Sequence, residues 1–152
     1  MLERFKVPEN DQIRIDHQDL RSTVESIFLK LDCSMEHAVA GADTLVSTDL
    51  RGVETHGVSN MLRTYVGEFQ SGKINSRPEV KVIRETPGTV ALDGDRGLGV
   101  MLAPGAMKRA IDKAKTVGIG VCVMQNSGHM GAIGHHAMLA AKENMVGMTT
   151  TS

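Results

Sequence analysis

Aromatic residues are scarce in this sequence, which has no tryptophan, one tyrosine and three phenylalanines among 152 residues. Proteins that bind single-stranded nucleic acid use aromatic rings on which the bases stack, so this scarcity argues against that class. Charge of one sign is lacking as well, because 17 lysines and arginines stand against 18 acidic residues and the formal net charge is -1. We therefore expect neither nucleic acid nor anionic lipid as a partner.

Cysteine is rare, and neither Cys33 nor Cys122 belongs to a CxxC pair. Two lone cysteines are typical of small buried side chains in a reducing compartment, and a disulfide is the less favoured alternative. The charged first residues lack the apolar centre of a signal peptide, and no apolar run approaches the ~20 residues that span a bilayer. The sequence thus predicts a cytoplasmic protein without a membrane partner.

Apolar residues recur at helical spacing through the first third of the chain. Asp16 and Ser34 are suitable N-caps for two helices, over residues 17–31 and 35–49, and a third helix is expected over 59–70, ending at Gly72. A polar stretch that contains glycines, residues 49–57, lies between the second and third helices. This interruption is the first place where we look for chemistry.

The second half of the chain alternates between strand and helix patterns. Strands are predicted over 80–84 and 89–93, then a helix over 100–116, a strand over 119–124 that is buried on both faces, a helix over 132–144 and a last strand over 145–150. This order predicts an α/β fold in which a helical N-terminal segment (residues 1–76) packs on a layered α/β sheet (residues 77–152), as one continuous unit. Because a last strand ordinarily leads into another element, we expect an incomplete fold, the first part of a longer protein. A complete small domain is the alternative.

The loop over residues 94–99 contains glycines in the order GxxGxG. A Rossmann dinucleotide site requires GxGxxG and an acidic residue at the end of the following strand, and neither is present here. We therefore predict a non-Rossmann fold, in which this loop forms a tight turn at the base of the site.

The stretch QNSGHMGA, residues 125–132, lies where a predicted strand ends and a helix begins. The carboxyl ends of strands form the ligand crevice of open α/β sheets, and Gly128 and Gly131 would allow close approach of the backbone to a ligand. The positive end of the following helix would keep His129 neutral, so that it could take a proton from an alcohol. The alternative is a histidine that is only hydrogen-bonded in a turn.

The stretch DLRGVETHG, residues 49–57, is the second candidate. His56 lies beside a glycine, and Arg51 could hold a substrate carboxylate with two parallel hydrogen bonds. Equally, Asp49 and Arg51 could only stabilise the loop by salt bridges. His129, His135 and His136 lack the spacing of metal ligands on a helix and have no carboxylate among them, so we expect no metal site and disfavour a metal-dependent hydrolase.

Taken together, DLRGVETHGVSNMLRTY and NSGHMGAIGHHAMLAAKENMVGMTTTS resemble the malate/L-lactate dehydrogenase type-2 family, which includes sulfolactate, ureidoglycolate and diketogulonate dehydrogenases. The resemblance covers nearly the whole chain but only the front part of the family's usual length. It implies hydride transfer between NAD or NADP and a small 2-hydroxy or 2-oxo acid such as malate or lactate, in a homodimer. It also implies that His129 and His56 both line the active site, and we favour His129 as the acid and base.

The remaining site residues follow from the same resemblance. The family often has a carboxylate-binding arginine four residues after the first histidine, where this chain has Asn60, so Arg63 or Arg51 is expected to replace it. Asn126 is the fourth expected substrate contact. The expected cofactor contacts are Gly128, Gly131, Thr150 and Thr151, and most of the family's nicotinamide-binding segments correspond to positions beyond this sequence. A catalytically inactive domain that only binds or assembles is the alternative function.

Overall fold

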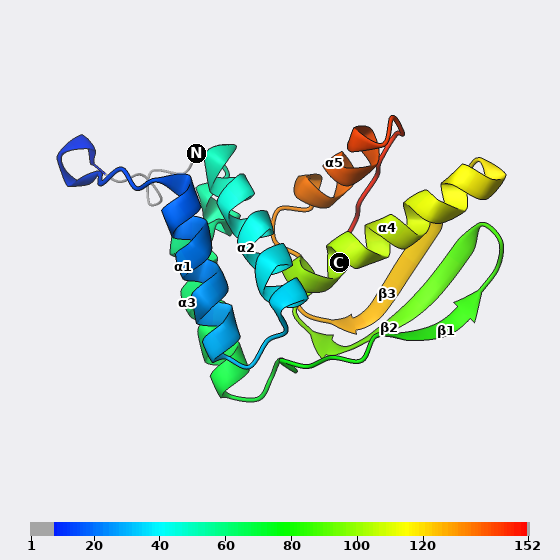
Figure 1. Ribbon diagram of the computed structural model, residues 1–152, viewed down its shortest axis with the longest axis horizontal. Coiled ribbons are helices and arrows are strands. Elements are labelled where there is room, and N and C mark those ends of the chain that lie inside the picture. The colour runs from blue at the N-terminus through cyan, green and yellow to red at the C-terminus, as the bar shows by residue number, and fades with distance from the viewer. Residues whose placement is uncertain (1–7, 152) are drawn as a thin grey trace.

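The computed structural model describes residues 8–151 as a helical group joined to a small sheet (Figure 1). Residues 1–7 and 152 lie outside the described part, and so does much of the segment for which the sequence predicts no signal peptide. The elements are η2 (Glu9–Asp11), α1 (His17–Lys30), α2 (Met35–Leu50), η3 (Glu54–His56), α3 (Val58–Gln70), β1 (Lys81–Glu85), β2 (Thr89–Gly97), α4 (Gly99–Val117), β3 (Val121–Ser127) and α5 (Gly134–Lys142). None of the described helices is both long and apolar enough to cross a membrane.

The three predicted N-terminal helices are confirmed, and local capping sets their ends. The carboxylate of Asp16 accepts hydrogen bonds from the N–H groups of Gln18 and Asp19 and so begins α1. Ser34 begins α2 in the same way, because its hydroxyl oxygen accepts from the N–H of His37. Gly72, with a φ of 72°, lies just beyond the end of α3 and adopts the left-handed conformation that glycine tolerates best.

The sheet has the order β1-β2-β3, in which β1 and β2 are antiparallel and β2 and β3 are parallel. Helix α4 makes the crossover between β2 and β3 and packs against both strands. The return into β3 requires a close approach, since a Cβ at Gly120 would lie 1.7 Å from the carbonyl oxygen of Ala110 in α4. In Figure 1, α4 lies between the sheet and α5, with α1–α3 at its N-terminal end.

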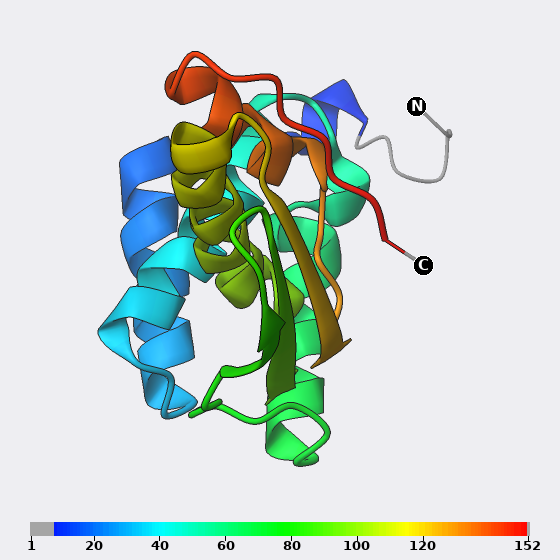
Figure 2. The same ribbon diagram turned by 90° about the vertical axis from the view of Figure 1, so that its right-hand side faces the viewer.

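Two features of the predicted sheet are wrong. Strand β3 is not buried on both faces, because α4 covers one face only and Val121 and Val123 are 45% and 58% exposed. Residues 145–150 are extended but form no strand, because no strand of the described chain pairs with them, and Val146 is fully exposed. Figure 2 shows this last segment running away from α5 beside the sheet. The described sheet therefore has three strands.

The main core lies where the N-terminal helices meet the start of α4, and it contains residues from both halves of the chain. Its centre includes Phe28 of α1, Leu45 of α2 and Tyr65 of α3, each fully buried. The remaining members of the cluster are Val24, Cys33, Ala38, Ala42, Ile74, Leu98, Val100 and Met101. Cys33 is buried as expected, Cys122 is half-buried, and neither is in a disulfide. This core fixes α3 relative to the junction of β2 and α4.

Histidines whose rings are wholly or partly shielded from water make the stability of the fold sensitive to acid. Burial lowers the pKa of His37, His129, His135 and His136 below the ordinary value. His136 is 1% exposed, its Nε2 lies 2.8 Å from the carbonyl oxygen of Met130, and its Nδ1 has no partner. A protonated ring would therefore place an N–H without an acceptor in the core.

We expect the free energy of unfolding to fall as the pH is lowered from about 7 to about 5.5. In this window the unfolded histidines bind protons that the folded ones, with lowered pKa values, do not, so the unfolded state gains. His136→Gln keeps an N–H donor for Met130 and should flatten the dependence measured by urea unfolding. His17→Gln, at the exposed start of α1, is the control. A free energy that is constant or rises towards acid would contradict this reasoning.

Candidate active site

The loop that carries His129 is held against the junction between β2 and α4. The N–H of Gly128 donates to the carbonyl oxygen of Gly97 at 2.8 Å, and the N–H of Val100 donates to that of His129 at 3.0 Å. A Cβ at Gly99 would lie 2.3 Å from the carbonyl oxygen of Gly128, so only glycine fits there. The predicted tight turn is wrong in form: residues 94–97 are the irregular end of β2, where Asp95 and Arg96 have positive φ, and α4 begins at Gly99, but the segment does support the histidine loop.

His56 belongs to η3, the short turn between α2 and α3. Asp49, in the last turn of α2, accepts a hydrogen bond from the N–H of Val58 at 2.9 Å through Oδ2 and so caps α3 from outside. Its other oxygen, Oδ1, is buried without a partner, and burial raises the pKa of this carboxyl. Thr55 Oγ1 lies 2.9 Å from His56 Nδ1, and this hydrogen bond fixes the orientation of the ring. Asp49 thus positions the turn that carries His56.

The two predicted histidines lie side by side. Their ring centroids are 5.5 Å apart and their planes differ by 21°, the geometry of offset stacking. The expectation that these distant segments converge is confirmed. The rings contact each other, so a small acid cannot lie between their faces and has to be reached from their edges. His129 is exposed and His56 is half-buried, so the pair is accessible from solvent.

Tyr65 is a third member of the group, and sequence reasoning missed its role. Its hydroxyl oxygen lies 2.8 Å from Nδ1 of His129, while its ring is fully buried in the core. The N–H of Gly131 also points to this nitrogen, at 3.3 Å. The helical spacing of the third helix identified Tyr65 only as an apolar position. The only feature of the sequence that singles out this residue is that it is the sole tyrosine, and this feature does not identify its hydrogen-bond partner.

Partial burial lowers the pKa of His129, and the charge of His56 lowers it further, while Glu68 acts in the opposite direction. The sequence argument ascribes the neutral ring to the next helix, but α5 begins only at Gly134. A neutral imidazole near physiological pH is available as a proton acceptor. The site therefore suits removal of a proton from a hydroxyl group.

The four expected substrate contacts are spread over the site and its surroundings. Asn60 uses its amide to donate to the carbonyl oxygen of Glu54 at 2.8 Å, within the His56 turn. Asn126 donates to Asp93 at 2.9 Å, at the ends of β2 and β3. Arg63 is exposed on α3. Arg51 lines a hollow of about 260 Å³ between α2 and α5, together with Ser47, Leu50, His135, Met138 and Lys142, and neither of the paired histidines lines this hollow.

The four expected cofactor contacts fall into two groups. Gly128 and Gly131 shape the histidine loop: Gly131 has a φ of 67°, and a Cβ there would lie 2.8 Å from Val100. Thr150 and Thr151 are exposed at the end of the described chain. The packing of the chain thus accounts for glycine at position 131, whereas a Cβ at Gly128 would make only ordinary contacts of 3.4 Å and more, and contact of either glycine with a cofactor stays a prediction.

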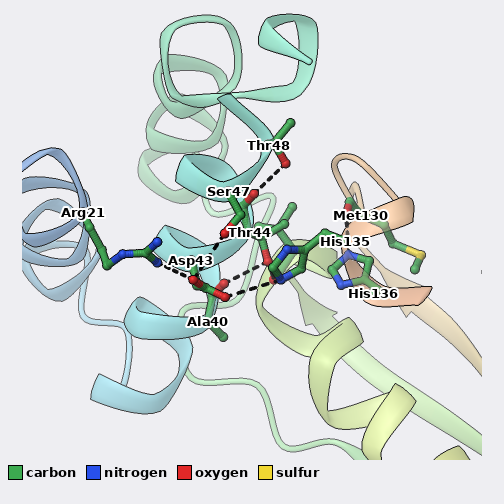
Figure 3. A network of polar contacts seen from close by, with 10 residues as sticks. Arg21, Ala40, Asp43, Thr44, Ser47, Thr48, Met130, His135 and His136 are labelled. Carbon is green, nitrogen blue, oxygen red and sulfur yellow. Dashed lines mark hydrogen bonds and ion pairs between the residues drawn. The ribbon is translucent and has the colours of Figure 1, made fainter. Parts of the chain in front are cut away.

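His135 and His136 lie in a separate polar network between α2 and α5 (Figure 3). Nε2 of His135 lies 3.6 Å from a carboxylate oxygen of Asp43, which is also ion-paired with Arg21. The two adjacent rings are perpendicular, with centroids 5.4 Å apart. Among residues 8–151 no cluster of histidine, cysteine and acidic side chains has the arrangement of a metal site. This network joins the N-terminal helices to α5.

Comparisons with known proteins match this chain to one group of dehydrogenases. A family model described as malate/L-lactate dehydrogenase matches residues 15–152. A malate dehydrogenase of Pyrococcus abyssi is 43% identical over the whole of this chain, and the match covers 41% of that protein. An L-sulfolactate dehydrogenase of Methanocaldococcus jannaschii is 36% identical over 87% of this chain and 38% of its own length. The chain thus spans about two fifths of the curated relatives that it matches.

The fold is similar to that of solved members of this group. A malate dehydrogenase structure from Pyrococcus horikoshii OT3 superposes with a TM-score of 0.86 at 44% identity, over 91% of this chain and 39% of that chain. The sulfolactate dehydrogenase of Methanocaldococcus jannaschii gives a TM-score of 0.84 at 32% identity, over 87% and 38% of the two chains. The α/β fold of this chain is therefore shared with these relatives.

Gly57 provides a test of how the His56 turn is held. A Cβ at this position would lie 1.6 Å from Asp49 Oδ1, so Gly57→Ala has to displace the carboxylate that caps α3. We expect this variant to lose about 2 kcal/mol or more of unfolding free energy in urea titrations. The control is Gly67→Ala in α3, where nothing lies within 4 Å, and helix propensity predicts a gain of about 1 kcal/mol. Equal effects of the two substitutions would argue against a positioning role of Asp49.

Proposed function

We propose, since this chain belongs to the malate/L-lactate dehydrogenase family, that it carries the proton-transfer site of an oxidoreductase acting on a small 2-hydroxy or 2-oxo acid such as malate or lactate. The hydride is exchanged with NAD or NADP. The observation that supports this proposal best is the contact between His56 and His129, whose ring centroids are 5.5 Å apart and which come from distant segments of the chain.

The proposed oxidation removes a hydride and a proton from the hydroxy acid, and each has its own acceptor. The C2–H bond of the hydroxy acid breaks with its electron pair, and the hydroxyl proton passes to a ring nitrogen of His129 while the C=O bond forms. The nicotinamide supplies the hydride acceptor when bound. The donor set fits this chemistry, because a neutral, exposed imidazole is the proton acceptor that it requires. In the reduction, C2 takes back a hydride and the imidazolium returns its proton to the carbonyl oxygen.

Other residues have supporting roles in this proposal. His56 lies against His129 and contacts the substrate oxygen or carboxylate as a second donor. Arg63 or Arg51 would hold the carboxylate, and Asn60 and Asn126 would contribute amide contacts. Thr150 and Thr151, both exposed, and the backbone at Gly128 and Gly131 are the proposed cofactor contacts. We further propose, from the resemblance alone, a homodimer that works in the cytoplasm.

The role of His129 is tested by replacing it in the protein as expressed from its own gene. His129→Gln should lower turnover about 10²-fold to 10⁴-fold, because a positioned acid and base is lost. His56→Gln should cost less, and His17→Gln, at the exposed start of α1, should leave turnover unchanged. The assay follows NADH and NADPH oxidation with a panel of 2-oxo acids. Full turnover of His129→Gln would reject the assignment, and inactivity with every acid would favour the binding or assembly domain.

The pH dependence should differ in sign between the two directions. Oxidation needs neutral His129, so kcat/KM should rise with pH through a single ionisation and level off. That ionisation should lie below the ordinary histidine pKa, because burial and His56 lower the pKa of His129. Reduction needs the protonated ring, so its rate should fall as the pH rises through the same value. Profiles of the same sign in both directions would contradict this mechanism.

A further inference from the structure

Nδ1 of His129 has two partners, although the proposed chemistry needs only one edge of the ring. The hydroxyl of Tyr65 lies at 2.8 Å and the N–H of Gly131 at 3.3 Å. Within residues 8–151 the structure gives Nε2 no hydrogen bond. Under the proposed function, the substrate proton would be exchanged at Nε2, because Nδ1 is engaged by Tyr65 and Gly131.

The partners of Nδ1 determine which nitrogen carries the proton. A backbone N–H can only donate, so the contact with Gly131 requires a lone pair on Nδ1. The neutral form that satisfies both contacts has its hydrogen on Nε2, and the Tyr65 hydroxyl and the Gly131 N–H then share the single lone pair of Nδ1. In this tautomer Nε2 has no lone pair with which to accept a proton.

Proton exchange at Nε2 needs the opposite arrangement at Nδ1. When Nε2 has given its proton to the substrate, or before it accepts one, the neutral ring has its hydrogen on Nδ1, and the charged ring has hydrogens on both nitrogens. The Gly131 N–H cannot accept a hydrogen bond from Nδ1. Of the two partners, only the hydroxyl oxygen of Tyr65 can.

We propose that Tyr65 is a positioning residue that controls the tautomer of His129, donating to Nδ1 in the resting ring and accepting from it whenever Nε2 exchanges a proton. The catalytic role of this hydrogen-bond switch rests on the proposed function, whereas the existence of the switch does not depend on it. A tyrosine hydroxyl can reverse in this way because it is both donor and acceptor and rotates about one bond. Burial raises the pKa of Tyr65 far above its ordinary value, so the hydroxyl keeps its hydrogen throughout.

The core makes this arrangement rigid. The Tyr65 ring is fully buried among α1, α2 and the start of α4, and its hydroxyl is the polar end that reaches the histidine loop. The titratable groups that face His129 are His56 from η3 and Tyr65 and Glu68 from α3. Glu68 is itself ion-paired with Lys73. Tyr65 is the only one of these groups with a hydrogen bond to the His129 ring.

The test is Tyr65→Phe, which removes the hydroxyl and keeps the ring in the core. Nitrogen-15 NMR of the histidine side chains across a pH titration reports both the tautomer and the pKa of His129. We expect the pKa of His129 to fall by about one unit or more, because the charged ring loses its acceptor at Nδ1. We also expect the neutral ring to stay more completely in the Nε2–H form than in the parent protein, and reduction at neutral pH to slow about tenfold with its acid limb displaced to lower pH.

A matched control separates this role from a structural one. Thr48→Val also removes a buried hydroxyl, which donates to the carbonyl oxygen of Thr44 at 2.6 Å and makes no hydrogen bond to the His129 ring. This variant should lower stability without changing the nitrogen shifts of His129. An unchanged pKa and tautomer of His129 in Tyr65→Phe would overturn the proposal.

Three further outcomes also decide the inference, and the last two separate it from the proposed function. If Tyr65→Phe does not fold, the parent protein decides, because a neutral His129 with its hydrogen mainly on Nδ1 would overturn the assignment. If His129→Gln keeps full turnover while Tyr65→Phe shifts the pKa of His129 as expected, the proposed function fails and the hydrogen-bond switch stands. If His129→Gln is inactive and Tyr65→Phe leaves the ring unaltered, only the switch fails.

Discussion

The hydrogen bond between Tyr65 and His129 connects the two parts of the molecule at the point where chemistry is expected. Tyr65 comes from the helical core, and His129 from the loop that follows the last strand of the sheet. The distance of 2.8 Å requires that α3 and this loop keep a fixed separation. The shared core under α4 provides that, because Leu98 and Val100 pack in the same cluster as Tyr65. The packing of the core thus determines the position of His129.

Close approaches of the backbone serve the same constraint on both sides of the site. Gly57 lies against the Asp49 carboxylate, and Gly99 lies against the carbonyl oxygen of Gly128. In each case the space that a Cβ would need is occupied by a group that orients a histidine-bearing turn. Gly57 and Gly99 therefore influence the orientation of the two imidazoles. This packing explains both glycines without reference to a ligand. Their cost in chain entropy is offset by hydrogen bonds at Val58 and Val100.

Much of the fold was accessible from the sequence, because local signals specify it. Asp16 and Ser34 are caps whose partners lie within the next three residues, so the helix starts could be read directly. The convergence of His56 and His129 was accessible only through the family resemblance, since no local signal relates two such distant turns. The role of Tyr65 was not predicted, because helical periodicity indicates that a side chain is buried but does not indicate which group its hydroxyl contacts.

The errors in the sheet have a different physical origin. The apolar runs at 119–124 and 145–150 indicate side chains suited to burial, but a strand also needs hydrogen-bonding partners and covering layers, and these depend on other segments. In residues 8–151, β3 has β2 on one edge and α4 on one face, and the extended segment after α5 has no neighbouring strand. An apolar pattern thus indicates the tendency of one segment to be buried, whereas strand pairing depends on at least two segments. This is why the helices were predicted more accurately than the strands.

Charges near the histidine pair change the pKa of His129 between the substrate-free and the substrate-bound site under the proposed reaction. A positive charge on His56 lowers the pKa of His129 across a separation of 5.5 Å between ring centroids. A substrate carboxylate beside the same rings acts in the opposite direction, because a nearby negative charge stabilises the imidazolium. Under the proposed function, the empty site would hold His129 neutral and ready to accept, and the bound acid would strengthen its affinity for the proton that the reaction releases. Proton affinity would then be greatest when substrate is present, which no fixed pKa of an isolated histidine provides.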